Sequence, residues 1–186
     1  MKKSVILLLF LMATSFGEKL IGQNIKPNNI IISTLAPDNF WGRYNIGIAY
    51  FLATKTDGLN LISLALNGGK TSTNISNQKI QGLDISGELN FYGQVLMSKK
   101  WDEYVGLKLS YGDFKNSTKD SKHNSFFIGM STGMQPVVAK RIAFKISSDL
   151  GYIQNGLTYN FLYNNRNVPF YSGFAIIFNV GVGIKL

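Results

Sequence analysis

The chain has 186 residues, enough for one domain with a full core, and charged residues make up 16% of it, against about 25% in an ordinary soluble domain. Aromatic residues reach 13%, which excludes the polar, highly charged composition of a disordered chain. The formal net charge is +9, and the absence of cysteine excludes both a disulfide framework and the lipid-modified cysteine of a lipoprotein.

The N-terminus has the pattern of a secretory signal. Lys2 and Lys3 precede an apolar run from Val5 to Ala13, far short of the about 20 residues that a membrane-spanning helix needs. Cleavage is expected after Ser15 or near Gly22-Gln23; we adopt the later position, which gives a signal peptide at 1–22 and one domain at 23–186. Because an exported chain rarely meets nucleic acid, anionic lipid headgroups are the expected counterpart of its positive charge.

A two-residue alternation of apolar and other side chains predicts β-strands in the rest of the chain. It is clearest from Leu83 to Met97, where the odd positions are apolar or glycine and the even positions are mostly polar. Glycine and β-branched residues at this density argue against helices. The predicted strands span 29–35, 42–53, 59–68, 81–97, 103–114, 124–135, 141–152 and 170–186.

The connections alternate in length along the chain. Short turns are expected at 54–58, 98–102 and 136–140, and long polar loops at 69–80, 115–123 and 153–169. Short turns on one side and longer loops on the other are typical of transmembrane β-barrels. A further hairpin through 157–163 is conceivable after Asn155-Gly156, but a ninth strand would separate the termini, so we interpret this segment as a loop extension. The predicted fold is all-β: an antiparallel eight-stranded transmembrane β-barrel with an up-and-down meander.

Charges on the polar faces indicate which side of the wall points inward. Six of them fall in mid-strand, three of each sign, and a closed lumen needs such a balance because an unpaired buried charge is costly. Eight strands also leave a lumen that side chains fill, so no open pore is expected. The predicted lumen charge network is Arg43, Asp84, Glu88, Lys108, Lys145 and Asp149.

Aromatic residues near the strand ends are the expected girdles at the two membrane interfaces. Ordinary packing at the ends of hairpins is the alternative interpretation. The predicted girdle residues are Trp41, Tyr44, Trp101, Tyr104, Phe170 and Tyr171.

With these features, the sequence resembles the small eight-stranded outer-membrane β-barrels of Gram-negative bacteria, of the OmpA-transmembrane-domain and OmpX kind. The most specific part is the last strand, whose alternating face is Phe178, Val180, Val182, Ile184 and Leu186. In that family such a strand is recognised by the barrel-assembly machinery and usually ends in an aromatic residue, whereas this chain ends in Leu186. The resemblance implies a porin-like monomer in the outer membrane, in contact with lipid and lipopolysaccharide.

Catalytic residues are scarce in this sequence. His123 and Ser125 have the His-x-Ser spacing of outer-membrane lipid A deacylases, but the following residues depart from that motif and the only acid beyond them is Asp149. No enzyme activity, cofactor or metal is therefore expected. The predicted loops carry an excess of basic residues, which either bind lipopolysaccharide phosphates or are simply solvated; they are Lys70, Lys79, Lys115, Lys119, Lys122 and Arg166, against Asp113 and Asp120.

The predicted function is a non-enzymatic structural, adhesive or envelope-interaction role in the outer membrane. A secreted soluble barrel that binds a small apolar ligand, and a lipid-modifying enzyme, are the alternatives.

Overall fold

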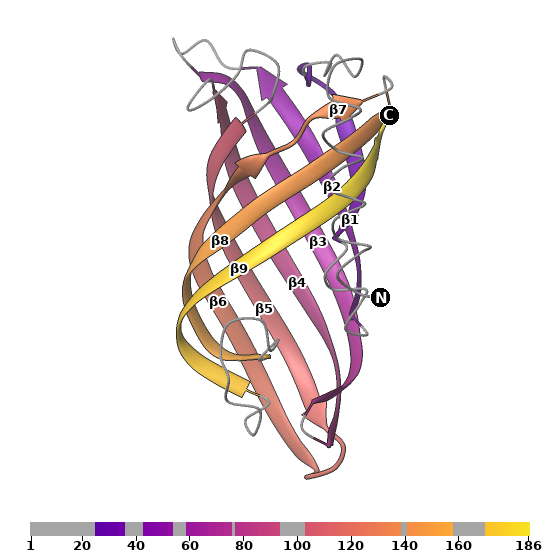
Figure 1. The fold of residues 1–186 in the computed structure, drawn as a ribbon, viewed down its shortest axis with the longest axis vertical. Coiled ribbons are helices and arrows are strands. Elements are labelled where there is room, and N and C mark those ends of the chain that lie inside the picture. Colours follow the sequence, from indigo (N-terminus) through magenta and orange to yellow (C-terminus); the bar gives the residue numbers. More distant parts are fainter. Residues whose placement is uncertain are drawn as a thin grey trace, which may run out of the picture.

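The computed structural model describes residues 25–35, 43–53, 59–75, 77–93, 103–138, 141–157 and 170–186. These residues form one sheet that closes into a barrel (Figure 1). The strands are β1 (Ile30–Leu35), β2 (Arg43–Ala53), β3 (Leu59–Ile75), β4 (Gln78–Gly93), β5 (Glu103–Asn116), β6 (Ser121–Met134), β7 (Val137–Val138), β8 (Ile142–Leu157) and β9 (Phe170–Lys185). Within these described ranges, no helix has the length and apolar character needed to cross a membrane.

The sheet is an antiparallel meander in which β1 pairs with β9 and so closes the ring. The short β7 continues β6: Met134 is the partner of Ile146 and Val137 the partner of Ala143, so both segments pair with β8 in the same register. The break falls at Pro136, which has no N–H to donate, although its carbonyl accepts from the Phe144 N–H at 2.9 Å. The nine segments thus make eight antiparallel strands, and the prediction of an all-β, eight-stranded antiparallel meander is confirmed.

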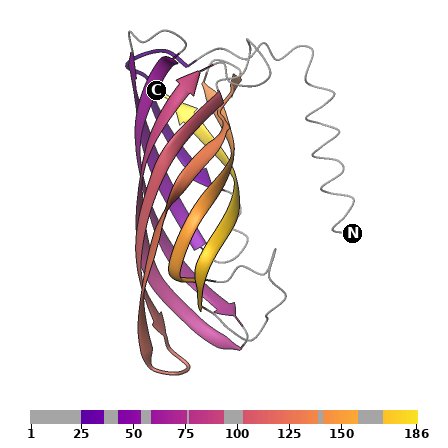
Figure 2. The same cartoon turned by 90° about the vertical axis from the view of Figure 1, so that its left-hand side faces the viewer.

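Two segments that the sequence predicts as long loops are mostly strand. Strands β3 and β4 pair as far as Ile75 and Gln78, and β5 and β6 pair as far as Asn116 and Ser121. The loops expected at 69–80 and 115–123 are therefore hairpins with short turns, and that prediction was wrong. The β5–β6 hairpin extends beyond the other strand ends, on the side away from the C-terminus (Figure 2).

The segment after Asn155 continues the neighbouring ladder. Gly156 and Leu157 pair with Tyr171 and Phe170, so β8 is longer than predicted and contains no new strand up to Leu157. The rest of the questioned hairpin, 158–163, and the expected signal peptide, 1–22, lie outside the described residues.

In the middle of the strands, the wall alternates between an apolar outward face and a buried inward face. On β5, Leu107 and Leu109 point outward and are 57% and 52% exposed, whereas Tyr104 on the inward face is 2% exposed. Successive side chains of a strand point to opposite faces, so one register places most of the apolar residues of a strand outside. The buried part of the molecule therefore lies within the barrel.

An apolar cluster occupies the inside of the barrel at the end where the C-terminus lies. Phe51 and Tyr92 form its centre, with ring centroids 5.4 Å apart. Residues from five strands and from the segment before β1 complete it: Ile25, Ile31, Leu61, Tyr104, Val137 and Ala143. This end of the lumen is filled by packed side chains.

Candidate functional site

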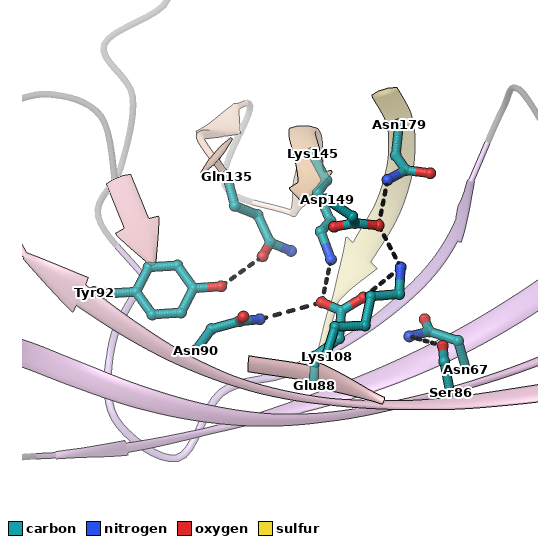
Figure 3. Close-up of polar contacts among 10 residues, drawn as sticks. All are labelled: Asn67, Ser86, Glu88, Asn90, Tyr92, Lys108, Gln135, Lys145, Asp149 and Asn179. Carbon is teal, nitrogen blue, oxygen red and sulfur yellow. Dashed lines mark hydrogen bonds and ion pairs between the residues drawn. The ribbon is translucent and has the colours of Figure 1, made fainter. Parts of the chain in front are cut away.

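Four charged side chains meet in the middle of the lumen and form a neutral cluster (Figure 3). Lys145 Nζ lies 2.6 Å from Glu88 Oε2, and Lys108 Nζ lies 2.7 Å from Asp149 Oδ2 and 3.4 Å from Glu88 Oε1. The Glu88 and Asp149 side chains are 0% and 1% exposed. Two cations thus offset two anions in a largely buried space, as a buried charge requires.

The strand order makes this cluster a bridge across the lumen. Glu88 on β4 and Lys108 on β5 are cross-strand partners, so their contact follows from the register. Lys145 and Asp149 come from β8, which is separated from β5 by β6. Because β4 and β8 lie on different sides of the ring, the Lys145–Glu88 contact joins two walls that share no backbone hydrogen bonds.

Two amides add one hydrogen bond to each carboxylate. Asn179 Nδ2 donates to Asp149 Oδ2 at 2.8 Å, and Asn90 Nδ2 donates to Glu88 Oε2 at 3.3 Å. Hydrogen bonds to ionised groups are stronger than those between neutral groups. Asn90 and Asn179 thereby help keep the carboxylates in place.

Glycine allows β6 and β8 to approach each other beside this cluster. Gly129 and Gly151 are cross-strand partners that face the lumen, and a Cβ added to either would collide with the main chain of the other strand. Without side chains here, the long Lys108 and Lys145 have room inside a barrel whose interior is only wide enough for side chains.

Aromatic contacts join the charge cluster to the apolar cluster at the end of the barrel where the C-terminus lies. Lys145 Nζ lies 5.5 Å from the centre of the Tyr104 ring, a cation–π arrangement. The Tyr104 and Tyr92 rings are 5.1 Å apart, and the Tyr92 hydroxyl donates to Gln135 Oε1 at 2.9 Å. Charged, aromatic and apolar layers therefore follow one another along the lumen.

The opposite mouth of the lumen holds a second aromatic group. The His123 and Phe170 rings are stacked with centroids 4.0 Å apart, and Phe114 lies 6.5 Å from Phe170. His123 Nε2 is 2.9 Å from Ser121 Oγ rather than bonded to Ser125. A His general base would need to contact the Ser nucleophile, so this arrangement gives no support to the deacylase alternative.

The structure brings together four of the six residues predicted for the lumen network. Asp84 lies on the same inward face of β4 as Glu88 but four residues nearer the β3–β4 hairpin, and it is half-buried. The Arg43 side chain lies outside the described residues. Within the described ranges, no group of three His, Asp or Glu side chains lies close enough together to hold a metal ion.

The predicted girdle needs correction at two positions. Tyr104 is 2% exposed and packs on Tyr92 inside the barrel, because it shares the inward face of β5 with Lys108. Phe170 stacks on His123 at the mouth of the lumen, where the β8–β9 register shifts between Ile153 and Gly156. A β-bulge bends the strand locally, so simple alternation fails there.

The other girdle residues are placed only in part. Trp41, Trp101 and the side chain of Tyr44 lie outside the described residues. Tyr171 is half-buried, and its hydroxyl donates to the Phe174 carbonyl at 3.1 Å. Its assignment to a girdle stays a prediction.

A row of outward-facing aromatic residues was missed by the sequence analysis. Tyr111 and Phe126 are cross-strand partners on β5 and β6, and Tyr152 and Phe174 are partners on β8 and β9. All four side chains are exposed, between 41% and 63%. Each of them shares its odd or even position along the strand with the outward apolar residues of that strand. This parity was the signal that would have found them.

The predicted insertion strand presents its apolar residues outward. Phe178, Val180, Val182, Ile184 and Leu186 are 64%, 48%, 43%, 58% and 69% exposed. Recognition of this strand by assembly machinery stays a prediction.

The closed ring and its inward and outward faces define the class of an eight-stranded antiparallel β-barrel. No family model matches the sequence, and no curated protein is significantly similar to it. The fold is similar to that of the N-terminal β-barrel domain of OprF from Pseudomonas aeruginosa, with a TM-score of 0.54 and 19% sequence identity over 86% of this chain and 98% of that one. Ail, the attachment invasion locus protein of Yersinia pestis, matches with a TM-score of 0.45 and 8% identity over 87% of this chain and 100% of that one.

Proposed function

We propose that this protein is an integral outer-membrane β-barrel with a non-enzymatic structural, adhesive or envelope-interaction role. The observation that carries the proposal is the distribution of side chains across the wall. Large apolar residues face outward around the barrel, whereas Glu88 and Asp149 are almost fully buried inside it. Water-soluble proteins have the opposite distribution.

The apolar exterior is too extensive for a barrel dissolved in water. Soluble monomers rarely expose contiguous apolar patches of more than a few hundred Å². Here every full-length strand contributes large apolar residues with an exposed fraction of 37% or more, among them Leu66, Ile85, Leu107, Ile128 and Phe178. Exposed apolar area costs about 25 cal/mol per Å² in water, so hydrocarbon is the medium that suits this face.

The interior argues against an open pore. The Glu88–Lys145 contact joins opposite walls, and the apolar cluster around Phe51 fills one end of the lumen. The barrel is therefore proposed to act through its membrane-facing surface and its hairpins, with a lumen that serves stability.

Cell fractionation tests this proposal. The protein expressed in a Gram-negative host should be recovered with outer membranes, and in a detergent gel the unheated form should migrate differently from the boiled form. A soluble periplasmic protein of similar size, expressed in the same cells, is the control for leakage between fractions. Recovery as a folded monomer without detergent would contradict the proposal and favour the soluble ligand-binding barrel.

A further inference from the structure

Beyond the apolar belt, the outward faces of β4, β5 and β6 carry three neighbouring lysines. Lys115 and Lys122 are direct cross-strand partners. Gln81 on β4 is the partner of Lys115. Lys79 lies two residues before Gln81, on the same face, and its carbonyl oxygen accepts a hydrogen bond from the Ser117 N–H at 2.8 Å. All three lysines are exposed, and regular strand pairing fixes their spacing.

The lysines lie just outside the row of aromatic residues. Lys115 is four residues from Tyr111, and Lys122 is four residues from Phe126. Four residues extend a strand by about 13 Å, or about 10 Å along the membrane normal at the usual barrel tilt. Because lysine reaches back along its apolar stem, the ammonium groups can approach the headgroup layer next to the hydrocarbon.

The cross-strand pairing of Lys115 with Lys122 places two cations side by side. Like charges directly opposite each other destabilise a sheet. Lys115 has one described ion pair, 3.0 Å from Asp120, but the two side chains are 54% and 87% exposed, so the pair contributes little. The described residues give Lys79 and Lys122 no ion pair, and the other acid on this face is Asp113.

We propose that Lys79, Lys115 and Lys122 form a binding site for the phosphate of an anionic lipid headgroup, in the leaflet next to the β5–β6 hairpin. An anion held between Lys115 and Lys122 removes their mutual repulsion, and each ammonium supplies up to three hydrogen-bond donors. The position on the outward wall, adjacent to the apolar belt, favours a membrane lipid over a soluble anion. This inference rests on the proposed membrane location and names a partner for that surface.

The test compares purified, refolded protein in two kinds of vesicle, phosphatidylcholine alone and phosphatidylcholine mixed with phosphatidylglycerol. The measured quantity is the folding equilibrium constant from urea titration, read by the gel shift between folded and unfolded forms. Anionic lipid should stabilise the wild type. Lys122→Gln should reduce this gain roughly fivefold, the factor for one lysine near an anionic surface.

The same variant should behave differently without anionic lipid. In phosphatidylcholine alone, Lys122→Gln should be as stable as the wild type or up to about fivefold more stable, because the repulsion of Lys115 is gone. Lys119→Gln is the matched control, since Lys119 lies in the turn of the same hairpin and its loss changes the net charge equally. This control should keep the full gain from anionic lipid.

Four outcomes would overturn the inference. Equal losses in Lys119→Gln and Lys122→Gln would show a non-specific charge effect. Inorganic phosphate or a sulfated polysaccharide could be added to the protein in phosphatidylcholine vesicles. If either stabilised the wild type as much as phosphatidylglycerol does, the site would bind a soluble ligand instead. No gain of the wild type from phosphatidylglycerol would exclude the lipid site. In these three cases, insertion of the protein into vesicles would leave the proposed membrane location intact. The fourth outcome is a protein that folds in water and never enters vesicles, which would overturn both the lipid site and the membrane location.

Discussion

The two faces of the barrel wall differ more sharply than any two regions along the chain. Leu107 and Lys108 are neighbours on β5, yet the Leu107 side chain is 57% exposed and the Lys108 side chain 12%. The outward face has almost no partners within the molecule, whereas the inward face is held by ion pairs, amides and rings. The two faces therefore differ in the surroundings that suit them: the outward face presents apolar side chains, and the inward face holds charges that are paired with one another.

Removing one charge from the lumen should have the largest effect. Glu88→Leu leaves Lys145 without its carboxylate partner and Lys108 with only Asp149, which should lower the free energy of unfolding by roughly 3–5 kcal/mol. Urea titration in detergent or lipid measures this loss. A loss well below about 1 kcal/mol would show that Glu88 faces solvent.

A double variant separates the cost of an orphan charge from the value of the pair. Glu88→Leu combined with Lys145→Met removes both partners, which leaves Lys108 paired with Asp149. Stability should return to within about 1–2 kcal/mol of the wild type, because apolar residues of similar volume often replace a buried ion pair without loss. If the double variant is as unstable as Glu88→Leu alone, packing rather than charge governs the site.

On the outward face, the cost of a charge should depend on its depth in the membrane. Leu107→Arg places a cation in the middle of the apolar belt and should destabilise the barrel by roughly 2–4 kcal/mol in lipid. Asp113→Arg, on the same face of β5 but beyond Tyr111, is the matched control and should cost roughly 0–1 kcal/mol. Similar costs at both positions would contradict the assigned belt.

A single buried hydroxyl should have the smallest effect. Tyr92→Phe removes the hydrogen bond to Gln135 and should cost about 1 kcal/mol, since the buried amide oxygen loses its partner. Tyr111→Phe removes an exposed hydroxyl and should change the stability by less than about 0.5 kcal/mol. Unfolding titrations of the two variants under one condition provide the comparison.

Parity along the strands was the most informative feature of the sequence. It places Glu88, Lys108, Lys145 and Asp149 on inward faces, and the structure brings these four together. Tyr104 was assigned to a girdle because it lies near a predicted turn. Its parity, shared with Lys108, already indicated the lumen.

The strand ends were harder to predict because the outward face changes character where it leaves the apolar belt. Residues 69–75 and 115–116 keep regular backbone pairing, but their outward side chains are polar, so the apolar alternation disappears. Polarity was therefore mistaken for a loop. Phe170 depends on a bulge between β8 and β9, which arises from long-range pairing rather than from a local pattern.

A cysteine scan along β5 tests the central claim most directly, because the chain has no cysteine of its own. Single cysteines at positions 105 to 115 would carry a nitroxide spin label in lipid vesicles, and its collisions with oxygen and with a water-soluble nickel complex would be measured. At Val105, Leu107 and Leu109 oxygen should dominate, and at Lys115 nickel should dominate. High nickel accessibility at Leu107, equal to that at Lys115, would contradict a membrane-facing exterior.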